Sequence, residues 1–117
     1  MINRLSCTVL ALLALAGCAS DPAPTEQMRL TEQAVAQARA VGANEQVAEL
    51  KMAEDKLQQA QAAMADEAFK EARMLAEQAE LDARVAEARV LTQKSQDQLA
   101  ELNKRIDRLR KQLGDLQ

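Results

Sequence analysis

The sequence predicts an all-α fold, either a helical hairpin or a three-helix up-down-up arrangement, with a long C-terminal coiled-coil helix. Alanine, glutamine, glutamate, leucine, lysine and arginine dominate the 117 residues, a composition typical of long helices. Apolar residues recur every three or four positions from residue 25 onward. The chain has one aromatic residue, Phe69, so we expect helices that pack closely through alanine rather than around a large aromatic core.

Residues 1–17 are predicted to be a signal peptide. A short segment with one positive charge precedes the apolar run Leu5–Leu15, which is too short to span a bilayer, because a spanning helix takes about 20 residues. The residues Leu15, Ala16, Gly17 and Cys18 follow and resemble the bacterial lipobox at all four positions. This resemblance implies that Cys18 becomes the first residue of the mature chain and carries acyl chains that anchor it to a membrane.

Residues 18–24 are predicted to form a lipidated tether, in which two prolines oppose helix formation. Ala19 follows the cysteine, and in lipoproteins of enteric bacteria a residue other than aspartate at that position favours the outer membrane. We therefore expect the periplasmic face of the outer membrane, with the inner membrane as the alternative because Asp21 lies close by. Cys7 is lost with the signal peptide, so no internal disulfide is expected.

Residues 25–90 are predicted to form an alanine-rich helical domain. The first helix is expected at about residues 26–41, because Thr25 can cap its start and Gly42 can cap its end. A second helix is expected at about residues 45–64. Asn44 is its expected N-cap, and the apolar face of this helix includes Val47, Leu50, Ala53, Leu57, Ala60 and Met64.

A third helix is expected at about residues 67–113, begun by Asp66 and ended by Gly114. Phe69 is expected to pack at the corner where this helix begins. The alternative is a single unbroken helix from residue 45 to residue 113.

The third helix is predicted to carry two kinds of apolar seam. Its first half carries small residues at Ala72, Ala76, Ala79, Ala83 and Ala86. Residues 91–117 form the coiled-coil extension, whose seam is in strict a/d register at Leu99, Leu102, Ile106, Leu109 and Leu113. Polar residues from Thr92 to Gln96 interrupt the apolar pattern, and a slip in register is expected there.

Helix lengths predict that the C-terminal seam stays uncovered. The first two helices are short enough to cover only about the first 22 residues of the third. An exposed leucine stripe usually marks an interaction site, and an isolated helix of this length is marginally stable in water. An up-down-up path also places the seam at the end away from the lipid, so we expect the seam to bind an envelope partner or a second copy of the chain.

Charges beside the seam bear on the choice of partner. In a parallel homodimer Arg105 would face Arg110 of the second copy, which is unfavourable by under about 1 kcal/mol. An acidic helical partner or a staggered antiparallel pairing would avoid this repulsion. The basic cluster Lys104, Arg105, Arg108, Arg110 and Lys111 either complements the helix macrodipole or contacts phosphate, lipid head groups or an acidic partner.

Residues 25 to about 90 resemble the domain-of-unknown-function 4398 (DUF4398) family of Gram-negative envelope lipoproteins. The segments that carry the resemblance are Glu32–Val35, Ala48–Leu50, Lys56–Ala60, Phe69–Arg73 and Leu75–Arg84. Members often show Gly-Asp-Tyr at the turn, whereas this chain has Ala65–Phe69 with the aromatic residue at a different spacing. The resemblance implies an envelope location and a helical fold, and it implies no activity.

The sequence favours a binding or structural role over an enzymatic one. It has no histidine and no glycine-rich phosphate loop, and its one mature thiol is expected to be acylated, so no catalytic residue, metal site, cofactor or small-molecule substrate is predicted. The net charge of −3 argues against nucleic-acid binding. We expect a membrane-anchored spacer or adaptor. The alternative is a self-associating structural lipoprotein that spaces membrane from peptidoglycan without covalent attachment, because the chain ends Asp115-Leu116-Gln117 without a terminal lysine.

Overall fold

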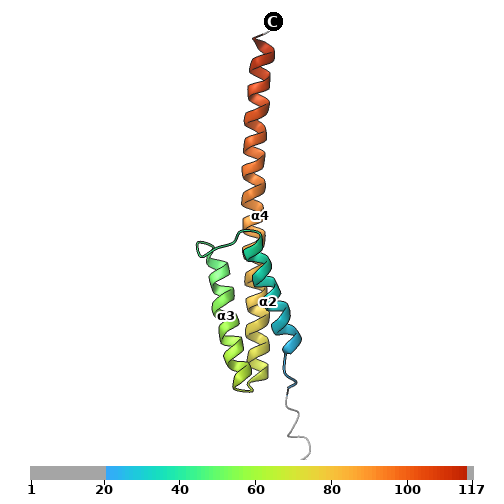
Figure 1. The fold of residues 1–117 in the computed structure, drawn as a ribbon, viewed down its shortest axis with the longest axis vertical. Coiled ribbons are helices and arrows are strands. Elements are labelled where there is room, and N and C mark those ends of the chain that lie inside the picture. The colour runs from blue at the N-terminus through green and yellow to red at the C-terminus, as the bar shows by residue number, and fades with distance from the viewer. Residues whose placement is uncertain (1–20, 116–117) are drawn as a thin grey trace, which may run out of the picture.

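A computed structural model describes residues 21–115, which form three helices (Figure 1). They are α2 (Thr25–Ala40), α3 (Ala48–Ala65) and α4 (Phe69–Gly114). The all-α prediction is confirmed in its three-helix up-down-up form, with the expected long C-terminal helix. The alternative of one unbroken helix from residue 45 is wrong, because the chain reverses direction at residues 66–68. The structure is more than a helical hairpin, because α2 packs on both α3 and α4.

Helices α2 and α3 lie against the first half of α4, and the second half of α4 extends beyond both (Figure 1). The start of α2 and the start of α4 lie at the same end of the molecule, and the C-terminus lies at the other. At 1.5 Å per residue, the 46 residues of α4 measure about 69 Å. Every described residue from Leu91 onward is exposed, so the three-helix bundle ends there.

Alanine forms the face of α4 that packs into the bundle. The five alanines Ala72, Ala76, Ala79, Ala83 and Ala86 are completely buried. Near the α2–α3 connection they meet Val35, Leu50 and Ala53, and toward the other end they meet Met28 and Ala60. Since a methyl side chain lets two helix backbones approach closely, this core is thin and depends on the small volume of each residue.

Thr31 is the largest fully buried side chain of the core. Its hydroxyl lies 2.9 Å from the carbonyl oxygens of both Gln27 and Ala76, so it can satisfy its donor within its own helix or across to α4. A buried hydroxyl without such partners would be costly. The contact with Ala76 is a buried polar contact between α2 and α4.

The helix ends differ from the capping predictions at three places. Thr25 is the first residue of α2, which Pro24 precedes, and no side chain caps that helix. Asn44 accepts a hydrogen bond from the backbone N–H of Gln46 at 2.9 Å within a turn, so α3 begins only at Ala48. An Asn side chain can stabilise a turn in the same way that it stabilises a helix start, and here the turn prevails.

The α3–α4 connection is tighter than predicted. Asp66 ends α3 instead of capping α4, and Glu67 adopts a left-handed conformation with φ 57°. Gly114 is the last residue of α4, so the predicted end of this helix at Gly114 is confirmed. The prediction for Gly42 is confirmed, because it follows α2 with φ 107° and the N–H of the next residue, Ala43, bonds the Ala38 carbonyl at 3.0 Å.

Ion pairs at the edges of the core join the three helices. Lys56 Nζ lies 2.6 Å from Asp82 Oδ2 between α3 and α4, and both side chains are about one quarter exposed. Arg39 and Glu54 join α2 to α3 at 2.8 Å. Glu49 at the start of α3 pairs with Arg89 of α4. These ion pairs help to fix the orientation of the three helices relative to one another, because the small alanine side chains of the core interlock only weakly.

Acid should destabilise the bundle, whereas changes of pH near neutrality should not. The hydrogen bond from Arg89 lowers the pKa of Glu49, and hydrogen bonds from Arg84 and then Gln27 lower the pKa of Glu80. A carboxyl whose pKa is lower in the folded state stabilises the fold above its unfolded pKa. That stability is lost as the pH falls through the lower, folded pKa.

We therefore expect the thermal midpoint to be constant between about pH 6 and 8, since the chain has no histidine, and to fall below about pH 4.3. Circular dichroism melts at a series of pH values measure this. Glu49→Gln is the control, because its melting temperature should fall less steeply in acid than that of the natural chain. A midpoint that changes between pH 8 and 6 would contradict the expectation.

Candidate functional site

The candidate site is the distal part of α4, which begins where the helix leaves the bundle. Lys94 makes the last contact across helices, with its Nζ donating to the Val41 carbonyl oxygen at 2.6 Å. Val90, one turn earlier, is the last partly buried apolar residue packed on the core. Beyond Lys94, the side-chain hydrogen bonds and ion pairs found among the described residues stay within α4.

The five predicted seam residues share one exposed face of this distal segment. Their exposed fractions are 59% for Leu99, 52% for Leu102, 44% for Ile106, 58% for Leu109 and 65% for Leu113. Neither α2 nor α3 reaches them, as the helix lengths predict (Figure 1). That they bind a partner stays a prediction, but the apolar surface that the prediction needs is present.

Local ion pairs accompany the exposed seam. Glu101 lies 3.1 Å from Arg105 and 3.3 Å from Arg108, and Asp107 lies 3.8 Å from Arg110. Pairs at three- and four-residue spacing stabilise an isolated helix by a few tenths of a kcal/mol each. Because all these side chains are well exposed, each arginine can exchange its intrahelical partner for an acidic group on another molecule at little cost.

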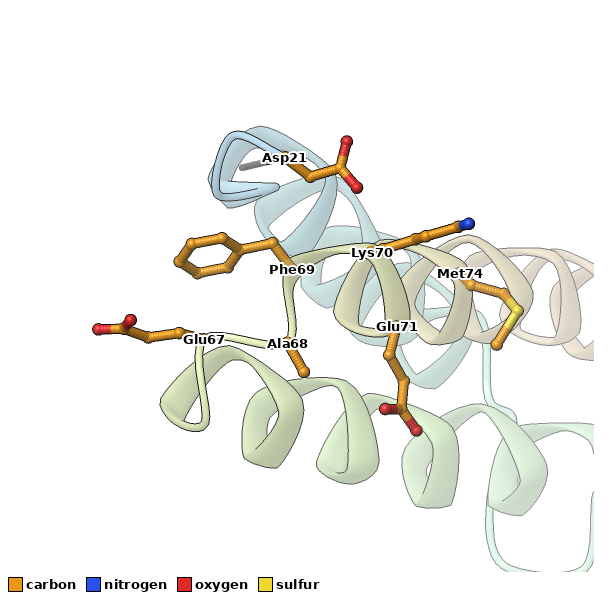
Figure 2. Close-up of a pocket in the computed structure, with 7 residues that line it drawn as sticks. All are labelled: Asp21, Glu67, Ala68, Phe69, Lys70, Glu71 and Met74. Carbon is orange, nitrogen blue, oxygen red and sulfur yellow. The ribbon is translucent and has the colours of Figure 1, made fainter. Parts of the chain in front are cut away.

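A second surface feature lies at the opposite end of the bundle, around the start of α4 (Figure 2). It is an open hollow of about 860 Å³ lined by seven residues, Asp21, Glu67, Ala68, Phe69, Lys70, Glu71 and Met74. The ring of Phe69 points out past the start of α4 instead of into the helix interface. Phe69 is half-buried at the corner where α4 begins, and it belongs to neither core cluster. That it anchors this corner stays a prediction.

Three exposed apolar residues of α4 within the bundle were not predicted as part of any site. Met74 is 51% exposed, Leu81 63% and Val85 53%. They lie on the half of α4 whose alanines are buried, so their helix presents an apolar face to solvent as well as to the core. The sequence signal for them is their spacing relative to Leu99.

Several predictions concern residues or ligands that the described structure does not reach. Cys18 and the lipobox residues Leu15, Ala16 and Gly17 lie outside residues 21–115. Within that range, no helix is both long and apolar enough to cross a bilayer. The same range holds no group of three or more cysteine or acidic side chains placed to hold a metal ion.

Comparison with known proteins identifies the family. The model of a domain of unknown function, DUF4398, matches residues 26–102. The chain belongs to the DUF4398 family. The crystal structure of a DUF4398 family protein from Pseudomonas aeruginosa PAO1 is similar to it, with 68% sequence identity and a TM-score of 0.80. The similarity covers 82% of this chain and 100% of that chain, and no curated protein matches.

The DUF4398 match confirms the predicted resemblance and extends it. The resemblance covered residues 25 to about 90, which end where the bundle ends. The family model continues to Leu102, so it includes the first two residues of the exposed seam. The match therefore includes the beginning of the free part of α4, up to Leu102.

Proposed function

We propose that this DUF4398 protein is a lipid-anchored, non-catalytic helical adaptor of the outer membrane, and that its distal seam binds a partner in the cell envelope. The observation that carries the proposal is the seam itself, in which five large apolar side chains on one helix face are 44–65% exposed. Burying a leucine or isoleucine fully is worth roughly 1.5–3 kcal/mol. A partner that covers this face would therefore gain substantial binding energy.

The arrangement of the two ends supports an adaptor. Asp21, three residues after the proposed acylated cysteine, lines the hollow at the start of α4. Leu99 follows the start of α4 by thirty residues, and Leu113 follows it by forty-four. At 1.5 Å per residue, the seam lies about 45–66 Å from the anchored end, so the chain would present it well away from the membrane surface.

The double substitution Ile106→Asp with Leu109→Asp tests the adaptor. A photoreactive residue at position 102 in intact cells should crosslink a partner, and the double substitution should reduce that crosslink at least tenfold, because two charges then lie in the apolar contact. Helicity and lipidation should be unchanged, since both side chains are exposed. Met52→Asp on α3 is the matched control, because Met52 is 48% exposed and lies away from the seam.

An unchanged crosslink in the double variant would overturn the adaptor proposal. Self-association of the purified protein in sedimentation experiments, abolished by the same double variant, would instead favour a structural spacer. Extraction of the peptidoglycan sacculus with detergent then separates the two forms of spacer. A covalently attached protein would stay with the sacculus, whereas a non-covalent spacer would be released.

A further inference from the structure

The exposed apolar face of α4 continues from the seam toward the start of the helix in the same heptad register. Counting back from Leu99 in alternating steps of four and three gives the positions Ser95, Thr92, Ala88, Val85, Leu81, Gln78 and Met74. Every one of these residues is exposed. We call the face from Met74 to Leu113 the long stripe, and its length is about 58 Å.

The long stripe lies on the side of α4 away from the bundle. The buried alanines occupy the b and f positions of the same heptads, which are roughly opposite the a and d positions on a helix of 3.6 residues per turn. Ala83 is completely buried, whereas Leu81 and Val85, two residues to either side, are 63% and 53% exposed. Helices α2 and α3 therefore leave the stripe open along its whole length.

The stripe carries polar residues at a few defined positions. Gln78, Thr92 and Ser95 take a or d positions that are otherwise apolar. Isolated polar residues in such a seam reduce stability but select the register of the helix that pairs with it. The run from Thr92 to Gln96 thus interrupts one continuous a/d face. The predicted slip in register corresponds to the change from the buried alanines at b and f to the exposed seam at a and d.

Charges beside the stripe differ between its two halves. Within the bundle, Asp82 is already paired with Lys56, Arg89 with Glu49, and Arg84 with Glu80. In the distal half the flanking e and g positions hold Arg105, Arg110 and four uncharged residues, Gln96, Gln98, Asn103 and Gln112. Arg105 and Arg110 pair within α4 with Glu101 and Asp107, but both arginines are well exposed and can exchange those partners. The flanks of the distal half therefore offer positive charge and no negative charge.

A second copy of this chain is a poor occupant of the stripe. Copies anchored in the same membrane would have to pair in parallel. Arg105 would then face Arg110 of the second copy, and Arg84 would face Arg89 of the second copy. Glu77 and Asp82 would form a third like-charge contact, and each such contact is repulsive.

We infer that the long stripe binds one extended amphipathic helix of another protein, about 40 residues long, with acidic residues beside its apolar seam where it passes Arg105 and Arg110. This inference rests on the proposed adaptor function and defines its partner. The length of the partner helix follows from the a/d register, which is continuous from Met74 to Leu113. Its acidity follows from the positive charge of Arg105 and Arg110 beside the stripe.

Two designed peptides test the acidity of the partner. Both are 40-residue helices with leucine at the a and d positions, and their e and g positions are all glutamate in one and all lysine in the other. Fluorescence anisotropy with the detergent-solubilised mature protein should show about tenfold tighter binding of the glutamate peptide. Arg105→Glu with Arg110→Glu should reverse that preference, and equal binding of both peptides would overturn the inference.

Photocrosslinking in cells tests the length of the contact. Photoreactive residues at positions 81 and 85 should crosslink the same partner as those at 102 and 109, whereas a photoreactive residue at position 52 should not. Crosslinks at 102 and 109 alone would leave the adaptor standing and overturn the long stripe. No crosslink at any position would overturn the adaptor itself.

Two other occupants are outcomes of the same experiments. A crosslinked product that consists of two copies of this chain would overturn the heterotypic helix. Binding of the purified protein to phosphatidylglycerol vesicles that Leu102→Asp abolishes would also overturn it, because the distal face would then be a lipid contact.

Discussion

Replacing Cys18 by serine should leave an unprocessed precursor that begins at Met1 and carries no acyl chain. The lipobox resemblance makes the Cys18 thiol the acceptor of the lipid, and a serine hydroxyl does not form the thioether. Each methylene buried in a bilayer contributes about 0.8 kcal/mol, so two or three acyl chains hold a protein on a membrane where one does not. Intact-protein mass spectrometry of the purified chain reads out both the cleavage and the lipid.

The sequence provides a matched control for this experiment. Cys7 is the other cysteine, and it lies within the proposed signal peptide. Cys7→Ser should be cleaved and acylated like the natural protein. Normal maturation of the Cys18→Ser variant would contradict lipidation at Cys18, and with it the membrane-anchored part of the proposed function.

Replacing Ala83 by leucine should strongly destabilise the bundle. Ala83 is completely buried among Val35, Leu50 and Ala53, and three added carbon atoms would push α4 away from its neighbours. Overpacking of this kind costs about 1–3 kcal/mol per site. Because the core consists largely of alanine and is thin, this is a large share of its stability, and we expect a clear fall in the melting temperature.

Ala88→Leu is the control for Ala83→Leu. Ala88 lies on the same helix, five residues further on, and is exposed. The same added volume there meets solvent, so the melting temperature should change little. Equal destabilisation by both variants would indicate that leucine acts through the helix alone and that close packing of the alanine face contributes nothing.

The existence and order of the helices could be predicted from the sequence, whereas their ends could not. The three-and-four spacing of residues such as Val35 and Leu50 identifies faces that must be buried, and both are buried. Capping depends on competition between local hydrogen bonds. Asn44 and Asp66 can each stabilise a turn or a helix start, and only the path of the whole chain decides which.

The candidate site was predicted in part. The exposed seam followed from arithmetic on helix lengths, which is reliable because the rise per residue is nearly constant. The apolar residues Met74, Leu81 and Val85 were missed, because the alanines between them already satisfied the expectation of a buried face. Two faces on one helix can both be apolar, and extending the heptad count from Leu99 back through Thr92 would have separated them.

Beyond Lys94 only α4 continues, so the distance from the bundle to the C-terminal end of α4 depends on the length of this one helix. One additional heptad inserted between Lys94 and Leu99 would move the seam about 10.5 Å further from the bundle and rotate it by only about 20°. The three-helix bundle formed by α2, α3 and the first half of α4 would not change. A protein with this architecture can span different distances when the free part of α4 is lengthened by whole heptads, and the bundle needs no other change.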